Sequence, residues 1–199
     1  MHTEPLYLNL AILRLVDVCV RVQDGMEDFL ATAGVEVVPR AENVLTWLRK
    51  RGVQTVLLSD YEEARTQVLM NRVNWGVGED ALAQHVVYDY RQYENPVARA
   101  TQLAGLPDAR TAFVLADRPE LLSQGHWVET YFNIGVTNGC CSYYELARAP
   151  HHGLLEDVRE LPNFLIEHLP ESGRGERAPA GERVGLLPRL RLGRLLGAA

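Results

Sequence analysis

Polar side chains stand at the ends of two apolar, strand-like runs and could take part in chemistry. Ser59 ends "TVLLS" and is followed by Asp60, and Asp117 ends "TAFVLAD". Strand tips are where α/β proteins hold phosphate and metal ions, so Ser59 and Asp60 are candidates for binding phosphate. Asp117, with Glu120 as a weaker partner, is a candidate metal ligand. Ser59 and Asp117 also suit helix N-caps, and for Asp117 the cap is favoured because Pro119 and Glu120 follow.

Histidines and cysteines give weaker signals. His126 lies between a helix and a strand, so we expect a surface or packing role. His151-His152 has no acid or cysteine at metal spacing, so we expect a solvated turn there. Cys19, Cys140 and Cys141 fit no zinc pattern, and their odd number argues against a disulfide framework. For the adjacent Cys140 and Cys141 we expect burial as small residues rather than joint chemistry.

Composition narrows the class of protein. The chain has 199 residues, a hydrophobic fraction of 47%, a charged fraction of 23% and a formal net charge of −6. These values are typical of a globular protein, and the negative charge argues against nucleic-acid binding. Because no apolar run is long enough to span a membrane and no signal peptide is visible, we expect a cytoplasmic protein.

Strand-like and helix-like segments alternate through most of the chain. We expect strands within residues 6–22 and at 53–59, 85–90, 111–117 and 130–136, and helices at 26–33, 41–52, 60–73, 96–105, 118–125, 142–149 and 154–169. This order predicts an α/β, Rossmann-like parallel sheet with helices on both faces. The carboxyl ends of the strands should then gather Ser59, Asp89, Asp117 and the Thr137-Asn138-Gly139 turn.

The C-terminal thirty residues differ from the rest. Residues 170–183 are rich in Pro, Gly and charge and predict a flexible linker, which places the folded domain at 1–169. Residues 184–199 interleave leucine with arginine and predict a segment that docks on a protein partner or folds back on its own domain or a second copy; membrane-surface binding is less favoured. The candidate contact residues are Leu186, Leu187, Arg189, Leu190, Arg191, Leu192, Arg194 and Leu195.

Residues 5–169 resemble the haloacid dehalogenase-like phosphohydrolases, and most of all the phosphonoacetaldehyde hydrolase (phosphonatase) group. The resemblance is carried by "GVEVVPRAENVLTWLRKRGVQTVLLSDYEEA", "VLADRPELLSQG", "NIGVTNG" and "ELPNFLIEHL", in order and spacing more than in identity. It implies an aspartate nucleophile at the end of the first strand, a Ser or Thr at the next tip, a Lys or Arg, and acids that hold Mg²⁺.

Several of these elements are replaced. The phosphonatase spacing puts Asn9 at the nucleophile position and Ala11 two residues later; Asp17 and Asp24 remain as alternatives. The sole lysine, Lys50, lies on the polar side of a helix, which leaves Arg91 as the base and Asn95 as a vestige. Four positions after Asp117 stands Leu121, and Glu120 could replace the missing acid only with a shifted backbone. The span between Asn9 and Ser59 is too short for a cap domain.

Three hypotheses follow. The favoured one is a capless, catalytically degenerate member of this fold that binds or assembles with other proteins, without a cofactor. The first alternative is a magnesium-dependent phosphatase with Asp17 or Asp24 as nucleophile, Arg91 as base and Asp117 with Glu120 as metal ligands. The second is a sensor that holds an anion at Ser59.

Overall fold

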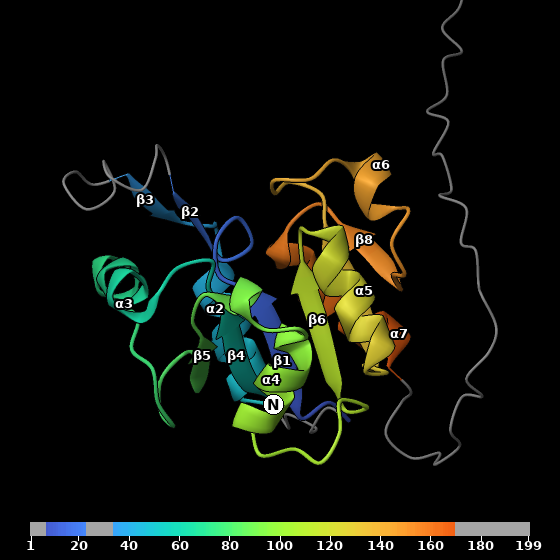
Figure 1. The fold of residues 1–199 in the computed structure, drawn as a ribbon, viewed down its shortest axis with the longest axis horizontal. Coiled ribbons are helices and arrows are strands. Elements are labelled where there is room, and N and C mark those ends of the chain that lie inside the picture. Colours follow the sequence, from blue (N-terminus) through green and yellow to red (C-terminus); the bar gives the residue numbers. More distant parts are fainter. Residues whose placement is uncertain (1–6, 23–33, 170–199) are drawn as a thin grey trace, which may run out of the picture. The chain divides into compact units, whose positions relative to one another are not determined.

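A six-stranded parallel sheet forms the centre of the computed structural model, which describes residues 7–22 and 34–169 (Figure 1). Its strands lie in the order β5 (His85–Val87), β4 (Gln54–Leu58), β1 (Leu10–Arg14), β6 (Ala112–Ala116), β7 (Phe132–Val136) and β8 (Gly153–Leu155). Every neighbouring pair runs parallel. The predicted α/β architecture is confirmed, and β1 lies in the middle with β4 and β6 beside it.

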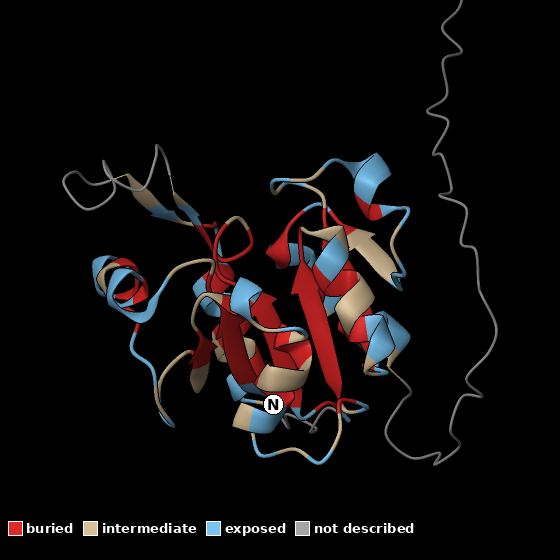
Figure 2. Cartoon of the chain, in the orientation of Figure 1, coloured by how far each residue is buried: buried red, intermediate tan, exposed pale blue. Residues whose placement is uncertain are grey.

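Both faces of the sheet are buried, as Figure 2 shows for its central strands. Side chains alternate along β1: Ala11 and Leu13 belong to one apolar cluster, and Leu10 and Ile12 to the other. Alternation on a strand with both faces covered explains why "LAIL" reads as a continuous apolar run.

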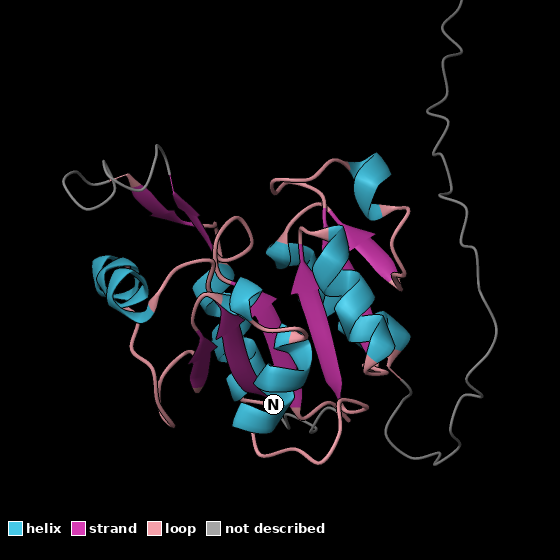
Figure 3. Cartoon of the chain, viewed as in Figure 1, coloured by secondary structure: helices cyan, strands magenta, loops and turns pink. Residues whose placement is uncertain are grey.

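Helices supply the other half of each cluster. Figure 3 shows how the helices and strands are arranged. Those of the described residues are α2 (Ala41–Arg49), α3 (Glu63–Arg72), α4 (Pro96–Leu103), α5 (Pro119–Trp127), α6 (Tyr143–Leu146) and α7 (Leu161–His168), with short 3₁₀ turns η1 (Tyr90–Gln92) and η2 (Val158–Glu160). Residues of α2 and α7 pack in the cluster of Leu13, and residues of α4 and α5 in the cluster of Ile12. Helices therefore cover both faces, as predicted.

The segment expected to hold at least one strand, within residues 6–22, contains two. After β1, β2 (Val20–Val22) pairs antiparallel with β3 (Val35–Val37) in a separate two-stranded sheet. Between β1 and β4 the described residues hold only this small sheet and α2. The predicted helix at 26–33 and Asp24 lie outside the described residues, as does the predicted linker and tail at 170–199.

One predicted helix was wrong in part. Leu154 and Leu155 were expected to begin a helix, but they form β8, which pairs with β7; α7 starts only at Leu161. A short apolar run does not by itself distinguish a strand from a helix. Among the described residues, no helix is long and apolar enough to cross a membrane.

Candidate active site at the tip of the central strand

Arg14 stands at the carboxyl end of β1, between the ends of its two neighbours. It pairs with Leu58, the last residue of β4, and Asp117 directly follows the last residue of β6. Ser59 and Asp60 follow β4 in the same way. Carboxyl ends of parallel strands meet at one edge of the sheet, so these polar residues gather around Arg14.

The guanidinium of Arg14 binds three carboxylates. Its Nη1 lies 2.6 and 2.7 Å from the two oxygens of Asp117 and 3.1 Å from Oδ2 of Asp17. Its Nε and Nη2 lie 3.1 and 2.9 Å from Oδ2 of Asp60. We call Arg14, Asp17, Asp60 and Asp117 the Arg14 cluster. Only 3% of the Arg14 side chain and none of the Asp117 side chain is exposed, whereas Asp17 is 31% exposed.

Electrostatics keep this arginine charged. Burial opposes the charge on Arg14, but Asp117 and Asp60 outweigh it and raise the pKa of the guanidinium. Burial, reinforced by the charge of Asp60, also raises the pKa of the nearby Tyr61 and Tyr90. A buried charge is tolerated when it is paired and hydrogen-bonded, and the three carboxylates meet that requirement.

Asp117 is fully engaged by this cluster and by the loop after β7. Besides binding Arg14, its Oδ2 accepts a hydrogen bond of 2.7 Å from the backbone N–H of Cys140. A Cβ added to Gly139 would lie 2.3 Å from Cβ of Asp117, so only glycine permits this approach. The predicted N-cap role is wrong: the N-cap residue of α5 is Arg118, which makes no capping hydrogen bond.

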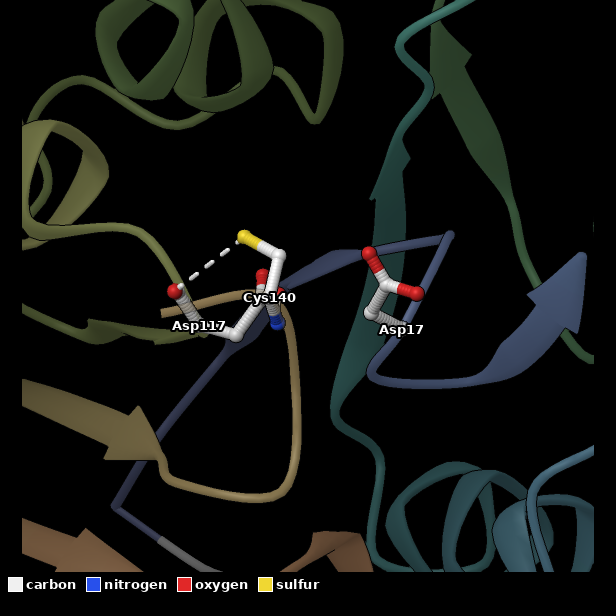
Figure 4. A group of neighbouring side chains, drawn as sticks. All are labelled: Asp17, Asp117 and Cys140. Atoms are coloured by element: carbon white, nitrogen blue, oxygen red, sulfur yellow. Dashed lines mark hydrogen bonds between the residues drawn. The ribbon is translucent and has the colours of Figure 1, made fainter. Parts of the chain in front are cut away.

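Asp17, Asp117 and Cys140 bring donor atoms within 4.8 Å of one another, a spacing that could hold a metal ion (Figure 4). They come from three segments: the turn after β1, the tip of β6 and the loop after β7. However, Nη1 of Arg14 contacts all three, at 3.1 Å, 2.6 Å and 3.8 Å respectively. The guanidinium thus occupies the position that a metal ion would take between Asp17 and Asp117. Because both carboxylates already bind Arg14, the arrangement does not fit Mg²⁺. Glu120, exposed in the first turn of α5, does not join this group.

Ser59 is buried, and its hydroxyl is already hydrogen-bonded. Its Oγ lies 2.7 Å from Oγ1 of Thr66 on α3, and it accepts a bond of 3.2 Å from the N–H of Tyr61. The N-cap residue of α3 is Glu62, so Ser59 does not cap that helix. Phosphate binding at Ser59 and Asp60 stays a prediction, and the carboxylate of Asp60, which binds Arg14, would oppose it.

Asn9 is at the wrong end of the strand. It is exposed, it precedes Leu10 at the start of β1, and its Nδ2 donates to Oγ1 of Thr111 at 3.3 Å. Ala11 is buried in the core. The predicted register was therefore wrong, because Asn9 precedes the strand and Arg14 is its last residue.

Arg91 reaches the Arg14 cluster and Asn95 caps a helix, and their predicted roles as base and vestige stay predictions. Nη2 of Arg91 forms an ion pair of 2.5 Å with Oδ1 of Asp60, so Asp60 joins Arg91 to Arg14. Asn95 is the N-cap of α4: its Oδ1 accepts from the N–H of Ala98 at 2.9 Å.

The histidines and cysteines are placed as follows. His126 is exposed in the last turn of α5, and Nδ1 of His152 accepts a bond of 2.9 Å from the N–H of Asn133. His151 is exposed beside the carbonyl of Ala149. Cys140 was expected to be buried but is exposed. Partial burial and then the hydrogen bond and charge of Asp117 raise the pKa of the Cys140 thiol to about 12.

Sequence reasoning missed Arg14, the residue that organises the site. A signal was present: "LAILR" ends on a polar residue after an apolar run, as "TVLLS" and "VLAD" do. The spacing of the phosphonatase group, which placed Asn9 at the strand tip, pointed away from this signal.

No family model and no curated protein sequence matches the chain. Solved structures do match. A haloacid dehalogenase family hydrolase from Deinococcus radiodurans, with bound phosphate and sodium, has a TM-score of 0.64 at 14% identity, covering 81% of this chain and 96% of that one. A haloacid dehalogenase-like family hydrolase from Streptococcus pneumoniae has 0.61 at 8% identity, covering 79% and 98%.

A third match is the deoxy-D-mannose-octulosonate 8-phosphate phosphatase from Haemophilus influenzae. It has a TM-score of 0.59 at 11% identity and covers 81% of this chain and 88% of that chain. Closeness to the phosphonatase group stays a prediction. The matches cover nearly the whole of each hydrolase, and the chain therefore has the fold of the haloacid dehalogenase-like hydrolases.

Proposed function

We propose that this protein is a catalytically inactive form of the haloacid dehalogenase-like fold that works by binding other proteins. The observation that carries the proposal is the position of Arg14 at the tip of β1, bound to Asp17, Asp60 and Asp117. The resemblance places a nucleophilic aspartate at the end of this strand. A guanidinium holds its proton and has no nucleophilic lone pair, so it does not replace that aspartate.

The same residue supports a loss of metal-dependent chemistry. Asp117, the predicted metal ligand, has both oxygens bound to Arg14 and one bound to the N–H of Cys140. A divalent cation at Asp117 would have to displace a buried, charge-paired guanidinium. Loss of the nucleophile and of the metal each raises the activation barrier by several kcal/mol. Since about 1.4 kcal/mol of barrier is a factor of ten in rate, losing both lowers the rate by many powers of ten.

A phosphatase assay tests this part. With Mg²⁺ and an aryl phosphate, we expect the full-length protein to show no turnover above a blank without enzyme. Turnover that is lost in Asp17→Asn and in Asp117→Asn, but kept in Asp108→Asn, would contradict the proposal. Asp108 is a suitable control because its carboxylate pairs with Arg110 outside the Arg14 cluster.

Such turnover would support the alternative of a magnesium-dependent phosphatase. Its specific support is Asp17, which the fold brings to the site: its carboxylate is 31% exposed and lies within 4.8 Å of the donor atom of Asp117. Asp17→Asn distinguishes this nucleophile from Asp24, which lies outside the described residues. The anion-sensor alternative gains no support from Ser59, because its hydroxyl is bonded to Thr66.

Partner binding is proposed to involve residues 184–199, on their composition alone, since they lie outside the described residues. We expect a chain ending at residue 183 to keep its melting temperature and to lose a partner that full-length protein recovers from a lysate. A chain whose tail has the same composition in scrambled order is the control for non-specific binding through charge or exposed leucines. A large fall in melting temperature on truncation, or equal recovery by the scrambled tail, would contradict a specific docking role.

A further inference from the structure

The loop after β7 brings the thiols of Cys140 and Cys141 together. Successive side chains of an extended strand point to opposite sides, but these two residues lie in a bend, and their Sγ atoms are 3.6 Å apart. Cys140 is exposed and Cys141 half-buried, so a small oxidant can reach both. We propose that the two thiols are an oxidative modification site, at which hydrogen peroxide converts them into a disulfide between adjacent residues.

The two sulfurs need only a short approach to form a bond. A disulfide bond is about 2.05 Å long, so the Sγ atoms must come closer by about 1.5 Å, which side-chain rotation can supply. Thiols that are already held side by side react as one unimolecular pair, which favours the bond between them over bonds to other molecules.

The loop is held in place on both sides of the pair. Before it, the N–H groups of Thr137 and Asn138 donate to backbone carbonyls at the end of β8 and just beyond it. After it, Ser142 forms a capping box with Glu145 at the start of α6. These fixed ends keep the two thiols together.

The reaction uses the two thiols in turn. The thiolate of Cys141 attacks one oxygen of the peroxide, the O–O bond breaks, and the leaving hydroxide takes a proton to form water. Cys141 is then a sulfenic acid. The sulfur of Cys140 attacks it, the S–S bond forms, the S–O bond breaks, and the proton of Cys140 leaves with the hydroxyl as a second water. Two electrons pass from the two thiols to one peroxide.

The surroundings of Cys140 favour this order. Partial burial, and then the hydrogen bond and charge of Asp117, raise the pKa of the Cys140 thiol, which keeps it protonated. Because the thiolate is the nucleophile, Cys141 attacks the peroxide and Cys140 resolves the sulfenic acid.

The bond between adjacent residues should be easily reduced again. Neighbouring Cα atoms are about 3.8 Å apart across a trans peptide, whereas disulfides usually join Cα atoms about 4.4–6.8 Å apart. The resulting strain makes such a bond labile to thiols, as in regulatory disulfides. The site is therefore suited to a reversible modification rather than to a permanent cross-link.

Oxidation would be felt by the Arg14 cluster and by α6. The backbone N–H of Cys140 donates to Oδ2 of Asp117 at 2.7 Å, and Asp117 binds Arg14, as Figure 4 shows for the contact between Cys140 and Asp117. The disulfide ring includes Cα of Cys140, so its closure strains this hydrogen bond. It also redirects the chain that leads into α6, where Tyr143 and Tyr144 are 50% and 78% exposed.

Peroxide treatment of the reduced, tag-free, full-length protein tests the proposal. Free thiols are counted in denaturant after the peroxide is removed. We expect the count to fall from three per chain to the single thiol of Cys19, and dithiothreitol to restore it. Mass spectrometry should find the loss of two hydrogens in the peptide that contains Cys140 and Cys141, without a covalent dimer.

Single variants test the order of the two steps, and circular dichroism establishes that each is folded. Cys140→Ser should stop the reaction at the sulfenic acid of Cys141, which a dimedone probe labels. Cys141→Ser should take up roughly 10-fold less label, because the attacking thiol is missing. Cys19→Ala should form the disulfide as wild type does, since Cys19 is buried elsewhere in the core.

Several outcomes would overturn the proposal. They are a wild-type count that stays at three thiols, a product that is a sulfinic acid, and a disulfide that joins two chains. Equal labelling of Cys140→Ser and Cys141→Ser would overturn the assignment of Cys141 as the attacking thiol. The wild-type count needs no variant, so it decides the main point by itself.

The melting temperature tests the link to Asp117. Oxidation should lower it by about 2–4 °C, because one hydrogen bond to a charged group is weakened, and dithiothreitol should restore it. Cys141→Ser, treated in the same way, should show no reversible shift, which controls for oxidation of methionines. Disulfide formation that leaves the melting temperature unchanged would overturn this link.

Discussion

At the scale of single residues, Arg14 determines what the strand tip can do. It lies in the one strand flanked by both β4 and β6, so its side chain reaches carboxylates that follow each neighbour. The sequence predicted Ser59 and Asp117 at strand tips correctly, because each ends an apolar run. It did not predict Arg14 as the tip of β1, because the phosphonatase spacing placed the nucleophile position at Asn9, whereas the end of the apolar run "LAIL" marks the tip.

Removing the charge of Arg14 should destabilise the fold strongly. Arg14→Leu leaves Asp117 and Asp60 without their buried cation, and breaking a buried ion pair by removing one partner costs about 3–5 kcal/mol. Side-chain exposures of 3%, 0% and 7% for Arg14, Asp117 and Asp60 place the group in that class. The free energy of unfolding in urea measures the loss.

Arg91→Leu is the matched control, since Arg91 also pairs with Asp60 but its side chain is 55% exposed. An exposed pair contributes about 0–1 kcal/mol, so the control should change little. Arg14→Leu/Asp117→Leu should recover part of the loss because no uncompensated charge stays at Asp117. Equal stability of Arg14→Leu and wild type would show that the cluster does not need its cation.

At the scale of elements, alternating apolar segments predicted the sheet and its helices well. The least reliable part was the C-terminal end, where Leu154 and Leu155 joined the sheet as β8. Among residues 7–22 and 34–169, their strand pairs only with β7, a contact that local sequence does not encode. Local signals succeeded at α4, where Pro96 in the first turn and Gly105 beyond the end bracket the helix.

Asn95 should stabilise the protein as the N-cap of α4. Its Oδ1 accepts from the N–H of Ala98, and its Nδ2 donates to the carbonyl of Gln124 in α5 at 3.1 Å. Asn95→Ala loses both bonds, and we expect a cost of about 1–2 kcal/mol in thermal or urea unfolding. Asn95→Asp keeps the acceptor and loses only the donor, so it should lie between Ala and wild type. If the two variants are equally stable, the cap contributes nothing.

At the scale of the whole molecule, the core on the α2 and α7 face includes a titratable group. Cys19 is fully buried in the cluster that contains Val18 and Leu45. Its position in the core follows from the turn between β1 and β2. The sequence predicted at least one strand within residues 6–22 but did not place this turn, because the apolar run is nearly continuous there.

Burial raises the pKa of Cys19 from 9.0 to about 12, which couples folding to pH. Below pH 8 the thiol is protonated in both states and its contribution to stability is complete. Between pH 9 and 12 the unfolded thiol ionises and the folded one does not, so stability falls as pH rises. One proton changes the free energy of unfolding by up to about 1.4 kcal/mol per pH unit.

Comparison with Cys19→Ala isolates this effect from other groups that titrate at alkaline pH. Below pH 8 the variant should be less stable by a constant amount, set by the cavity it leaves. That deficit should shrink from pH 9 to 11, because only wild type loses the protonation contribution. Val18→Ala creates a cavity in the same cluster without a titratable group, so its deficit should stay constant with pH. Parallel curves for Cys19→Ala and wild type would mean that the thiol ionises in the folded protein as readily as in the unfolded chain.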